Sequence, residues 1–394
     1  KPHAGMRIYD PTSGSGGMLV QARNYLAANN ENAANLSLYG QEMNLNTWAI
    51  CKMNMFLHGV FSADIRKGDT LRNPQHTQNG ELMTFDRVIA NPPFSLKKWG
   101  KEEADNDAYG RFPYGTPPKD AGDLAFVQHM IASTNAEGMA GIVMPHGVLF
   151  RGSSEKAVRQ GMLQDDLIEA VIGLPSGLFY GTGIPACLLI INKKKPKARK
   201  NKVLFINSEL EFEEGKNQNK LREQDIAKIV EVFETFTEIK RYSKVVDISE
   251  IEDNDFNLNI RRYADTSPPP EIFDVRAILH GGIPVREVED DYIQDEILKG
   301  FDVQGCTNAA GAGCTGAVDV SGIMVKRDKE YYDFNPEIKN KEQISELMGD
   351  ASSEAIKQLE YWWDKYKVSL HELDEQVADA EDVMKGFLQE LGYE

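Results

Sequence analysis

A short stretch in the first hundred residues combines a rigid turn with hydrogen-bond acceptors and an aromatic ring. Residues 88–90 are nonpolar and of the type that forms a buried strand, and Asn91-Pro92-Pro93-Phe94 follows them directly. Proline ends a strand because it has no N–H, and it keeps the preceding residue out of the helical conformation. In open α/β sheets, ligands bind at the carboxyl ends of the strands. The sequence therefore predicts a stiff turn at a ligand-binding edge.

The groups in this turn suit the transfer of a methyl group to an amine on an aromatic base. Such an amine is a poor nucleophile because its lone pair is delocalised into the ring. Two acceptors on its N–H hydrogens help to localise the lone pair, and the side-chain oxygen of Asn91 and the carbonyl oxygen of Pro92 are suitable acceptors. Phe94 can stack on the base, and a sulfonium methyl donor needs no general base before transfer. Asn-Pro alone is also common in turns without chemistry, so this turn by itself favours a structural role.

A second candidate lies upstream, where a predicted strand ending at Asp10 runs into a glycine-rich turn and then a helix over residues 18–28. Glycines at 14, 16 and 17 let the backbone approach a ligand closely and leave N–H groups available at the helix start. Their spacing differs from the G-x-G-x-x-G pattern of dinucleotide-binding proteins. Asp10 suits a ligand ammonium group better than a pyrophosphate.

Acidic residues also follow the next two predicted strands. Glu42 comes after the strand 38–41, where it can accept hydrogen bonds from ribose hydroxyls. Asp69 follows the strand 63–66 closely, where it can bind an adenine amino group. Each acid alone is typical of a solvated or capping residue. Three acids after three successive strands, with the proline turn after the fourth, form a much stronger joint signal for one composite site.

Taken in order, four motifs resemble those of AdoMet-dependent amino-group DNA methyltransferases: DPTSGSGG from residue 10, YGQEMN from 39, GDTL from 68 and NPPF from 91. Within that family the likeness is closest to the methylation subunit of type I restriction–modification systems. It spans about residues 1–264, and NLNIRRY from residue 257 resembles the segment that closes that subunit's catalytic domain. The resemblance implies an α/β fold with a doubly wound, mostly parallel seven-stranded sheet, and methylation of DNA at adenine N6.

The resemblance also implies which residues contact which group. The residues implied at AdoMet are Asp10, Thr12, Gly14, Gly16, Gly17, Glu42, Asp69, Leu71 and Asn91. The residues implied at a flipped adenine, and therefore in catalysis, are Asn91, Pro92 and Phe94. Ser13 stands where the family commonly has Cys, which is a tolerable change at a small turn position. No metal site is expected.

The net charge of −17 bears on how such a protein meets DNA. Affinity for nucleic acid depends largely on neutralising phosphates, so either DNA is not the substrate or a partner provides most of the affinity for DNA, and the resemblance favours the second. The resemblance implies DNA as substrate, a specificity subunit that reads the sequence, and a restriction subunit in the full complex. The basic segment 193–202 is a local exception, and it fits a solvated hairpin loop and a phosphate contact equally well.

Other functions match parts of the pattern. Methyltransferases that modify glutamine side chains also use an NPP turn, but they favour Tyr after the prolines; cytosine-N4 methylation poses the same chemical problem as adenine-N6. Cytosine-C5 methylation is disfavoured because it needs a nucleophilic Cys at the end of the fourth strand, where none occurs. The chain starts at Lys1, just before the first strand, and so reads as truncated. A truncated scaffold that binds partners without AdoMet is a further alternative.

The sequence suggests three regions: a catalytic domain over 1–264, a linker and poorly ordered segment over 265–335, and a helical interaction region over 336–394. Ser267-Pro268-Pro269-Pro270 predicts a stiff linker, and the Gly/Ala-rich stretch 305–322 predicts poor order. Nonpolar residues from Ile356 to Leu391 alternate spacings of three and four over 36 residues. They predict one helix of about 54 Å. Such a helix can pack on its own domain, but its length exceeds what a small domain covers and favours a partner, for which the resemblance implies the specificity subunit.

Residues 95–122 form a long loop with little periodicity directly after the proline turn. Loops of this length are usually functional or disordered, and we expect this one to close over the extruded adenine. Removal of residues 101–118 should then spare AdoMet binding and weaken methylation.

Composition is that of an ordinary soluble globular protein, with 41% hydrophobic and 27% charged residues. No nonpolar run approaches the roughly 20 residues that span a bilayer, and no signal peptide is visible. The four cysteines show no C-x-x-C pair, which indicates free thiols and makes zinc binding unexpected. These features predict a cytoplasmic protein without membrane contact.

Overall fold

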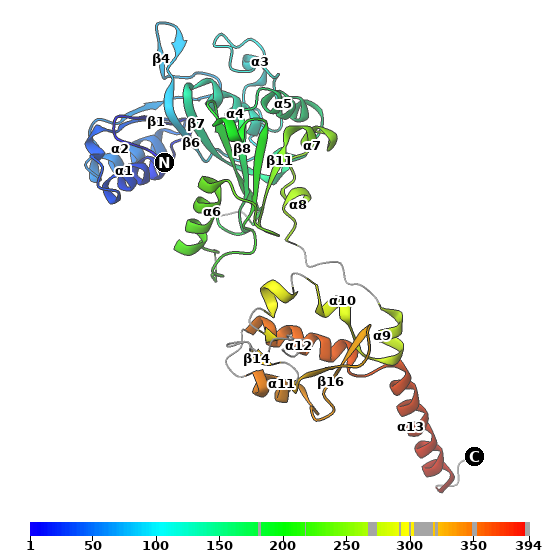
Figure 1. The fold of residues 1–394 in the computed structure, drawn as a ribbon. Coiled ribbons are helices and arrows are strands. Elements are labelled where there is room, and N and C mark those ends of the chain that lie inside the picture. Colours follow the sequence, from blue (N-terminus) through cyan, green and yellow to red (C-terminus); the bar gives the residue numbers. More distant parts are fainter. Residues whose placement is uncertain are drawn as a thin grey trace. The chain divides into compact units, whose positions relative to one another are not determined.

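The chain divides into two compact units, each of which is described by itself. The computed structural model describes residues 1–179, 183–216, 218–266, 274–290, 293–298, 301–302, 318–319, 322–348 and 353–390. Unit 1 is Lys1–Ser267 and unit 2 is Pro268–Glu394 (Figure 1). Two predictions, the stiff linker at Ser267–Pro270 and poor order over 305–322, fall wholly or mostly outside the described residues.

Unit 1 is built on a nine-stranded sheet with the strand order β11-β10-β8-β9-β7-β6-β1-β2-β3. The strands are β1 (Arg7–Asp10), β2 (Ser37–Glu42), β3 (Asp64–Lys67), β6 (Phe85–Ala90), β7 (Thr134–Pro145), β8 (Ile168–Gly173), β9 (Ala186–Asn192), β10 (Lys202–Asn207) and β11 (Ser243–Asp247). Strands β3, β2, β1, β6 and β7 are parallel in that order, and β9 runs antiparallel between β7 and β8. The prediction of a mostly parallel sheet is confirmed. The predicted number of seven strands is wrong, because β10 and β11 extend the edge of the sheet beyond β8.

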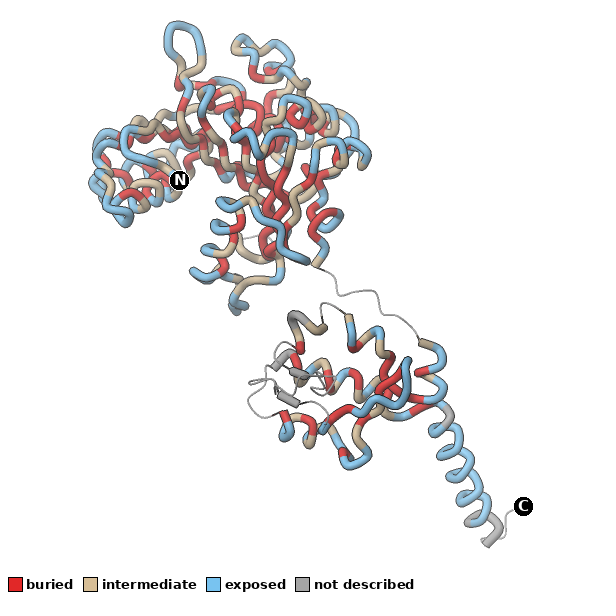
Figure 2. Tube along the Cα trace, in the orientation of Figure 1, coloured by how far each residue is buried: buried red, intermediate tan, exposed pale blue. Residues whose placement is uncertain are grey.

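Both faces of the sheet are buried, because its strands carry nonpolar residues at successive positions. Tyr9 and Phe205 belong to the core on one face, whereas their neighbours Ile8 and Leu204 belong to cores on the other. Such continuous nonpolar strands are typical of sheets covered by helices on both sides. Figure 2 shows the buried strands through the middle of unit 1.

The helices cover the two faces in alternation with the strands, which confirms a doubly wound fold. Residues of α1, α2 and α6 pack in the cores on one face, and residues of α4, α5 and α7 pack in the core on the other. The helices are α1 (Gly17–Ala28), α2 (Leu45–Leu57), α3 (Lys101–Ala104), α4 (Asp123–Ala132), α5 (Ser153–Gln164), α6 (Glu223–Thr235), α7 (Ile248–Asp253) and α8 (Ile260–Tyr263), with short turns η1 (Ala33–Asn35), η2 (His146–Leu149) and η3 (Lys197–Arg199). A small hairpin, β4 (Thr77–Gln78) and β5 (Glu81–Leu82), precedes β6.

The basic segment 193–202 is not a hairpin loop, because β10 pairs with β8 and β9 lies on the opposite side of β8. Several of its cations have partners within unit 1. Lys195 Nζ lies 2.6 Å from Asp166 Oδ1, and Arg199 Nη1 lies 3.2 Å from the buried Glu169. Lys193 Nζ donates to the carbonyl of Thr134 at 2.7 Å. These partners favour a structural role over a phosphate contact.

Unit 2 has its own hydrophobic core, so the predicted division at 335/336 needs correction. Strands β12 (Ile283–Pro284), β15 (Met324–Lys326) and β16 (Tyr331–Phe334) form one sheet. Their residues share a core with α11 (Lys341–Met348) and α12 (Ser353–Tyr366), so part of the predicted linker region belongs to this folded unit. The other elements of unit 2 are α9 (Val275–His280), α10 (Val285–Val288), η4 (Ile293–Ile297), β13 (Phe301–Asp302), β14 (Val318–Asp319) and α13 (Leu370–Glu390).

The predicted single C-terminal helix is two helices, α12 and α13, separated at residues 367–369. The break is explained by a capping box: Ser369 Oγ accepts from Glu372 N at 3.1 Å, and Glu372 Oε2 accepts from Ser369 N at 2.9 Å. Helix α12 buries Leu359 and Trp362 in the core of unit 2. Helix α13 instead exposes nonpolar residues along its length, namely Leu370, Leu373, Val377, Val383 and Met384.

Two negative findings apply to the part of the chain that the structure describes. No helix in it is both long enough and nonpolar enough to cross a bilayer. No group of three or more His, Cys, Asp or Glu residues in it has a geometry that can hold a metal ion. Cys51 and Cys187 are free and buried, and the other two cysteines lie outside the described residues.

Independent cores predict independent unfolding of the two units. Trp362 is 1% exposed in unit 2, and Trp362→Ala should lower the stability of that unit by about 3–5 kcal/mol, because large-to-small changes leave a cavity. Differential scanning calorimetry of the whole chain should show one transition moving down and the transition of unit 1 unchanged. Tyr361→Ala, at a position 43% exposed on the same helix, is the control and should move neither. A common shift of both transitions would contradict independence.

Candidate functional site

The glycine turn after β1 is held in shape by its own hydrogen bonds. Asp10 is 1% exposed, and its Oδ1 accepts from Thr12 N at 3.0 Å. Gly14 and Gly16 have φ of +52° and +80°, which residues with a Cβ adopt rarely. A Cβ on Gly16 would also lie 2.5 Å from Met55 Cε on α2. The turn therefore keeps its backbone open on one side and packs tightly against α2 on the other.

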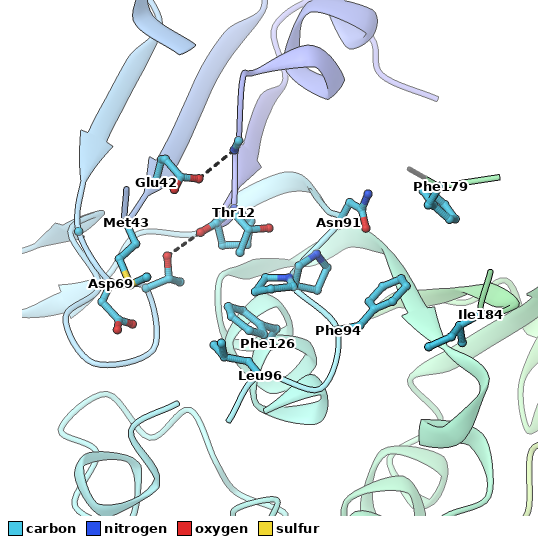
Figure 3. A pocket seen from close by; sticks show the side chains of 16 residues that line it. Thr12, Glu42, Met43, Asp69, Asn91, Phe94, Leu96, Phe126, Phe179 and Ile184 are labelled. Atoms are coloured by element: carbon cyan, nitrogen blue, oxygen red, sulfur yellow. Dashed lines mark hydrogen bonds between the residues drawn. The ribbon is translucent and has the colours of Figure 1, made fainter. Parts of the chain in front are cut away.

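Glu42, at the end of β2, is tied to this turn. Its Oε2 accepts from Gly14 N at 3.1 Å (Figure 3), and its Oε1 accepts from Asn44 N at 2.8 Å. The carboxylate therefore sits beside the glycine turn, although the two residues are 28 positions apart in the sequence. The end of β2 and the turn that follows β1 are therefore hydrogen-bonded to each other.

Asp69 follows β3 and stabilises the turn that it begins. Its Oδ1 accepts from Leu71 N at 3.0 Å and from Arg72 N at 3.1 Å. The neighbouring Thr70 donates from Oγ1 to the carbonyl of Pro11 at 2.5 Å, which joins this turn to the glycine turn. Three strand ends are thus connected by direct hydrogen bonds.

The proline turn after β6 completes a single cavity of about 710 Å³. Clefts of roughly 300–1,000 Å³ are typical of small-ligand sites. The cavity lies at the carboxyl ends of β1, β2, β3 and β6, and Figure 3 shows Asn91, Phe94, Thr12, Glu42 and Asp69 around it. Its lining residues are Pro11, Thr12, Gly14, Glu42, Met43, Gly68, Asp69, Thr70, Asn91, Pro92, Pro93, Phe94, Leu96, Phe126, Phe179 and Ile184.

Most residues predicted for the site line this cavity, and four do not. The predicted residues in the lining are Thr12, Gly14, Glu42, Asp69, Asn91, Pro92 and Phe94. Asp10 is buried beneath Thr12, and Gly16 and Gly17 lie where α1 begins. Leu71 is 1% exposed and packs in a small core with Phe126, which itself lines the cavity.

Sequence reasoning missed the nonpolar residues that complete the cavity wall, namely Met43, Leu96, Phe126, Phe179 and Ile184. Phe179 lies opposite Phe94, with ring centroids 6.3 Å apart and planes at 78°. It comes from the connection between β8 and β9, which the sequence marks only as a turn rich in Gly and Pro. The feature of the sequence that could have indicated Phe179 as a site residue is an aromatic side chain in a turn that follows a buried strand.

An ionic cluster with two buried carboxylates and a half-exposed arginine holds the residue that follows the proline turn. Ser95 N donates to Asp123 Oδ1 at 2.7 Å, and Ser95 has a φ of +49°. Arg151 Nη1 lies 3.6 Å from both Asp123 Oδ2 and Glu155 Oε1. Burial raises the pKa of both carboxyl groups, and Arg151 opposes the rise. Asp123 therefore fixes the backbone direction just after Phe94.

The loop 95–122 does not form a detached lid. Trp99 is 1% exposed and donates from Nε1 to the carbonyl of Pro118 at 2.8 Å. Of the described residues that line the cavity, Leu96 is the one contributed by this loop, and none comes from 101–118. Arg111 in this segment is buried and bonds to the carbonyls of Thr70 and Leu71. Removal of residues 101–118 would therefore also remove these two hydrogen bonds to the turn of Asp69, and the expectation that it spares AdoMet binding stays a prediction.

The buried carboxyl group of Asp10 is the main electrostatic feature behind the cavity. Burial raises its pKa to about 7, the N–H of Thr12 opposes the rise, and the negative charge of Glu42 adds to it. An acid in this position binds a proton near neutrality in the absence of a cation. A positively charged group placed beside it would favour the ionised form.

Comparison with known proteins assigns the chain to a family. The model of the N-6 DNA Methylase family matches residues 1–271. The chain belongs to the N-6 DNA methylase family. This confirms the assignment suggested by the four motifs, and it places the whole sheet and the cavity within the matched region.

Individual relatives of this N-6 DNA methylase are methylase subunits of type I restriction enzymes. The MjaVII subunit of Methanocaldococcus jannaschii is 39% identical over 302 residues, which cover 74% of this chain and 51% of that protein. The HindI subunit of Haemophilus influenzae is 33% identical over 276 residues, covering 68% and 60%. The crystal structure of a type I methyltransferase subunit from Streptococcus thermophilus superposes with a TM-score of 0.61 at 36% identity, covering 66% and 55%. The chain spans about half the length of the first of these relatives.

The raised pKa of Asp10 predicts a pH-dependent cost to folding. Because the folded pKa of about 7 lies above the ordinary aspartate pKa of 3.8, Asp10 contributes stability below pH 4 that is lost as pH rises to 7. Asp10→Asn should remove this dependence, since an amide resembles the protonated acid. The free energy of unfolding of the variant minus that of the wild type should therefore grow between pH 4 and pH 7, by at most about 1.4 kcal/mol per pH unit.

Urea denaturation of both proteins at pH 5, 6, 7 and 8 measures this difference and cancels the titration of other groups. A difference that stays constant from pH 5 to pH 7 would show that Asp10 does not carry a raised pKa.

Proposed function

We propose that this chain is the catalytic part of a type I methylase subunit, which transfers a methyl group from AdoMet to N6 of an adenine in DNA. The observation that carries the proposal is one cavity lined on one side by the glycine turn, Glu42 and Asp69, and on the other by Asn91 to Phe94. A methyl donor and an amine must meet within bonding distance, and a shared cavity provides this. The family match favours adenine N6 over a protein glutamine as the acceptor.

The residues present suit AdoMet. Gly14 lines the cavity with a φ of +52°, so its backbone offers a ligand a close approach. Glu42 is placed to accept hydrogen bonds from ribose hydroxyls, and Asp69 to accept one from the adenine amino group. The carboxyl group of Asp10 accepts from Thr12 N, and an ammonium group of the ligand beside it would stabilise its ionised form. When bound, AdoMet supplies a methyl group made electrophilic by the sulfonium.

The proline turn orients the acceptor amine. The side-chain oxygen of Asn91 and the carbonyl oxygen of Pro92 accept its two N–H hydrogens and thereby direct its lone pair toward the donor. Phe94 contacts the face of the base, and Phe179 closes the pocket at an angle of 78° to Phe94. Asp123, which holds Ser95 N, keeps this turn from rotating. Catalysis then depends mainly on positioning.

DNA is the proposed substrate although the chain carries a net charge of −17. The proposal therefore includes a specificity subunit that binds DNA, with a restriction subunit in the full complex. Helix α13 is the proposed contact with the specificity subunit, because Leu373, Val377 and Met384 lie exposed on one side of it. Between residues 370 and 386 its charged residues are mostly acidic, namely Glu372, Asp374, Glu375, Asp379, Glu381 and Asp382 against Lys385. A partner helix with basic residues flanking a nonpolar seam fits this surface.

The experiment that tests the function combines the chain with a candidate specificity subunit, labelled AdoMet and DNA. The methylated nucleoside is then identified by mass spectrometry after digestion. The proposal predicts N6-methyladenine that appears only when both proteins are present. Methylated cytosine, methylated protein, or no transfer at any protein ratio would contradict it.

Asn91→Ala should abolish transfer and leave AdoMet binding intact. Loss of one acceptor removes polarisation of the amine, so turnover should fall at least about 100-fold, while the Kd for AdoMet stays within about twofold. Turnover is measured on the assembled complex and Kd by calorimetry. Asn29→Ala, at the exposed end of α1, is the control and should match the wild type in both. An Asn91→Ala complex with normal turnover would refute the role.

Val377→Asp should prevent assembly with the specificity subunit, because it places a charge in the exposed nonpolar seam of α13. Glu375→Gln, on the opposite side of the helix, is the matched control and should assemble normally. Size-exclusion chromatography with light scattering measures complex formation, and circular dichroism checks that both variants are folded. Normal assembly of Val377→Asp would exclude α13 as the contact. Removal of residues 370–394 is the corresponding truncation, since α12 belongs to the core of unit 2.

A further inference from the structure

Two arginines connect the segment that contains Asp69 with the segment that follows the proline turn. We call residues 68–72, which contain Asp69, the cofactor turn, and residues 95–112, which follow the proline turn, the target loop. One arginine, Arg111, reaches from the target loop to the cofactor turn, and the other, Arg72, reaches in the opposite direction. Neither arginine lines the cavity.

Arg111 is 3% exposed and uses its whole guanidinium group. Its Nη1 donates to the carbonyl of Thr70 at 3.0 Å, and its Nη2 donates to the carbonyl of Leu71 at 2.8 Å. Its Nε and Nη2 also lie 2.8 and 2.7 Å from Asp107 Oδ1, and Asp107 is 6% exposed. Only a planar fork with five donors can hold two adjacent carbonyls and a carboxylate together.

The Arg111 network continues to β1. Arg111 Nη1 lies 3.4 Å from Nδ1 of the buried His129. Burial and the nearby Arg111 lower the pKa of His129 well below its usual value, so the ring is neutral and its Nδ1 accepts. His129 Nε2 is then protonated and lies 3.4 Å from the hydroxyl of Tyr9, the residue before Asp10. The target loop is thereby connected to the strand that carries the glycine turn.

Arg72 makes the reverse connection. Its Nη2 donates to the carbonyl of Lys98 at 2.6 Å, and its Nε lies 3.2 Å from Glu103 Oε1 on α3. Gly100, with a φ of +102°, lies against the arginine stem, and a Cβ there would be 2.7 Å from Arg72 Cγ. Arg72 also lies 3.5 Å from Asp69 Oδ2, the carboxylate proposed to bind the adenine of AdoMet.

We propose that Arg111 and Arg72 are positioning residues that couple AdoMet binding to the conformation of the target loop, so that AdoMet and the target base favour each other's binding. The inference rests on the proposed function, since it takes the cofactor turn as the AdoMet contact. A ligand that orders the cofactor turn also restrains Thr70 and Leu71, whose carbonyls hold Arg111. By reciprocity, a base that orders the target loop increases AdoMet affinity by the same factor.

The test is amide hydrogen exchange, followed by mass spectrometry, on the whole chain with and without AdoMet. In the wild type, AdoMet should slow exchange in residues 95–112 as well as in 68–72. Arg111→Lys keeps one positive charge but cannot bond to both carbonyls and Asp107. It should weaken AdoMet binding about tenfold, and saturating AdoMet should then protect residues 68–72 without protecting 95–112.

Arg159→Lys is the matched control for loss of a buried guanidinium. Arg159 is 2% exposed and donates to two carbonyls, those of Phe256 and Val148, away from the cofactor turn. It should lose thermal stability as Arg111→Lys does and keep the AdoMet Kd and the protection of 95–112. Arg72→Ala, at a side chain 43% exposed, keeps the fold and should reduce the protection of residues 97–104.

The outcomes separate this inference from the proposed function. A wild-type chain that binds no AdoMet contradicts both. A wild type that binds AdoMet but shows no slowing in residues 95–112 overturns the coupling alone. An Arg111→Lys variant with normal Kd and normal protection of 95–112 overturns the role of Arg111, and equal losses in Arg159→Lys show a merely structural effect.

Discussion

The parallel register of five neighbouring strands is the constraint on which the site depends. Asp10 of β1 lies opposite Gly40 of β2, Glu42 opposite Lys67 of β3, and Ala90 of β6 opposite Ile142 of β7. Because parallel strands end at the same edge of a sheet, the residues that follow them must meet there. Residues separated by up to about eighty positions are brought together by backbone pairing, before any side chain contributes.

Buried and half-buried polar groups form hydrogen bonds between the segments at this edge of the sheet. Asp123 holds Ser95 N, Glu42 holds Gly14 N, and Thr70 holds the carbonyl of Pro11. Each contact joins connections that follow different elements, so the rim of the cavity is cross-linked. A rigid rim suits a reaction whose catalysis consists of placing a donor and an acceptor, since small displacements have large effects on rate.

Local sequence patterns predicted the cavity better than they predicted the edges of the fold. Strand ends followed by Asp10, Glu42 and Asp69, with Asn91 after the fourth strand, were predictable because hydrophobic runs and turn residues are local signals. The extension by β10 and β11 was not predicted, because pairing of β10 with β8 is a long-range choice between equally nonpolar neighbours. Phe179 was missed for the same reason, since its approach to Phe94 depends on the path of a long connection.

The C-terminal region shows a different failure. The heptad spacing continues through Ser369, but a capping box at Ser369 and Glu372 ends one helix and starts another. The S-x-x-E signal was present in the sequence and outweighs nonpolar periodicity, because it satisfies backbone N–H groups at a specific position. The break also separates the nonpolar residues into two groups. Those of α12 pack in the core of unit 2, and those of α13 are exposed.

The most direct test of the central claim is a crystal structure of the chain with sinefungin, an analogue that carries an amine in place of the AdoMet methyl group. The account predicts its ribose at Glu42, its adenine at Asp69, and its amine pointing toward the side-chain oxygen of Asn91 across the shared cavity. An analogue bound elsewhere, or bound with its amine facing away from Asn91, would contradict the claim that these strand ends bring a methyl donor to an aromatic amine.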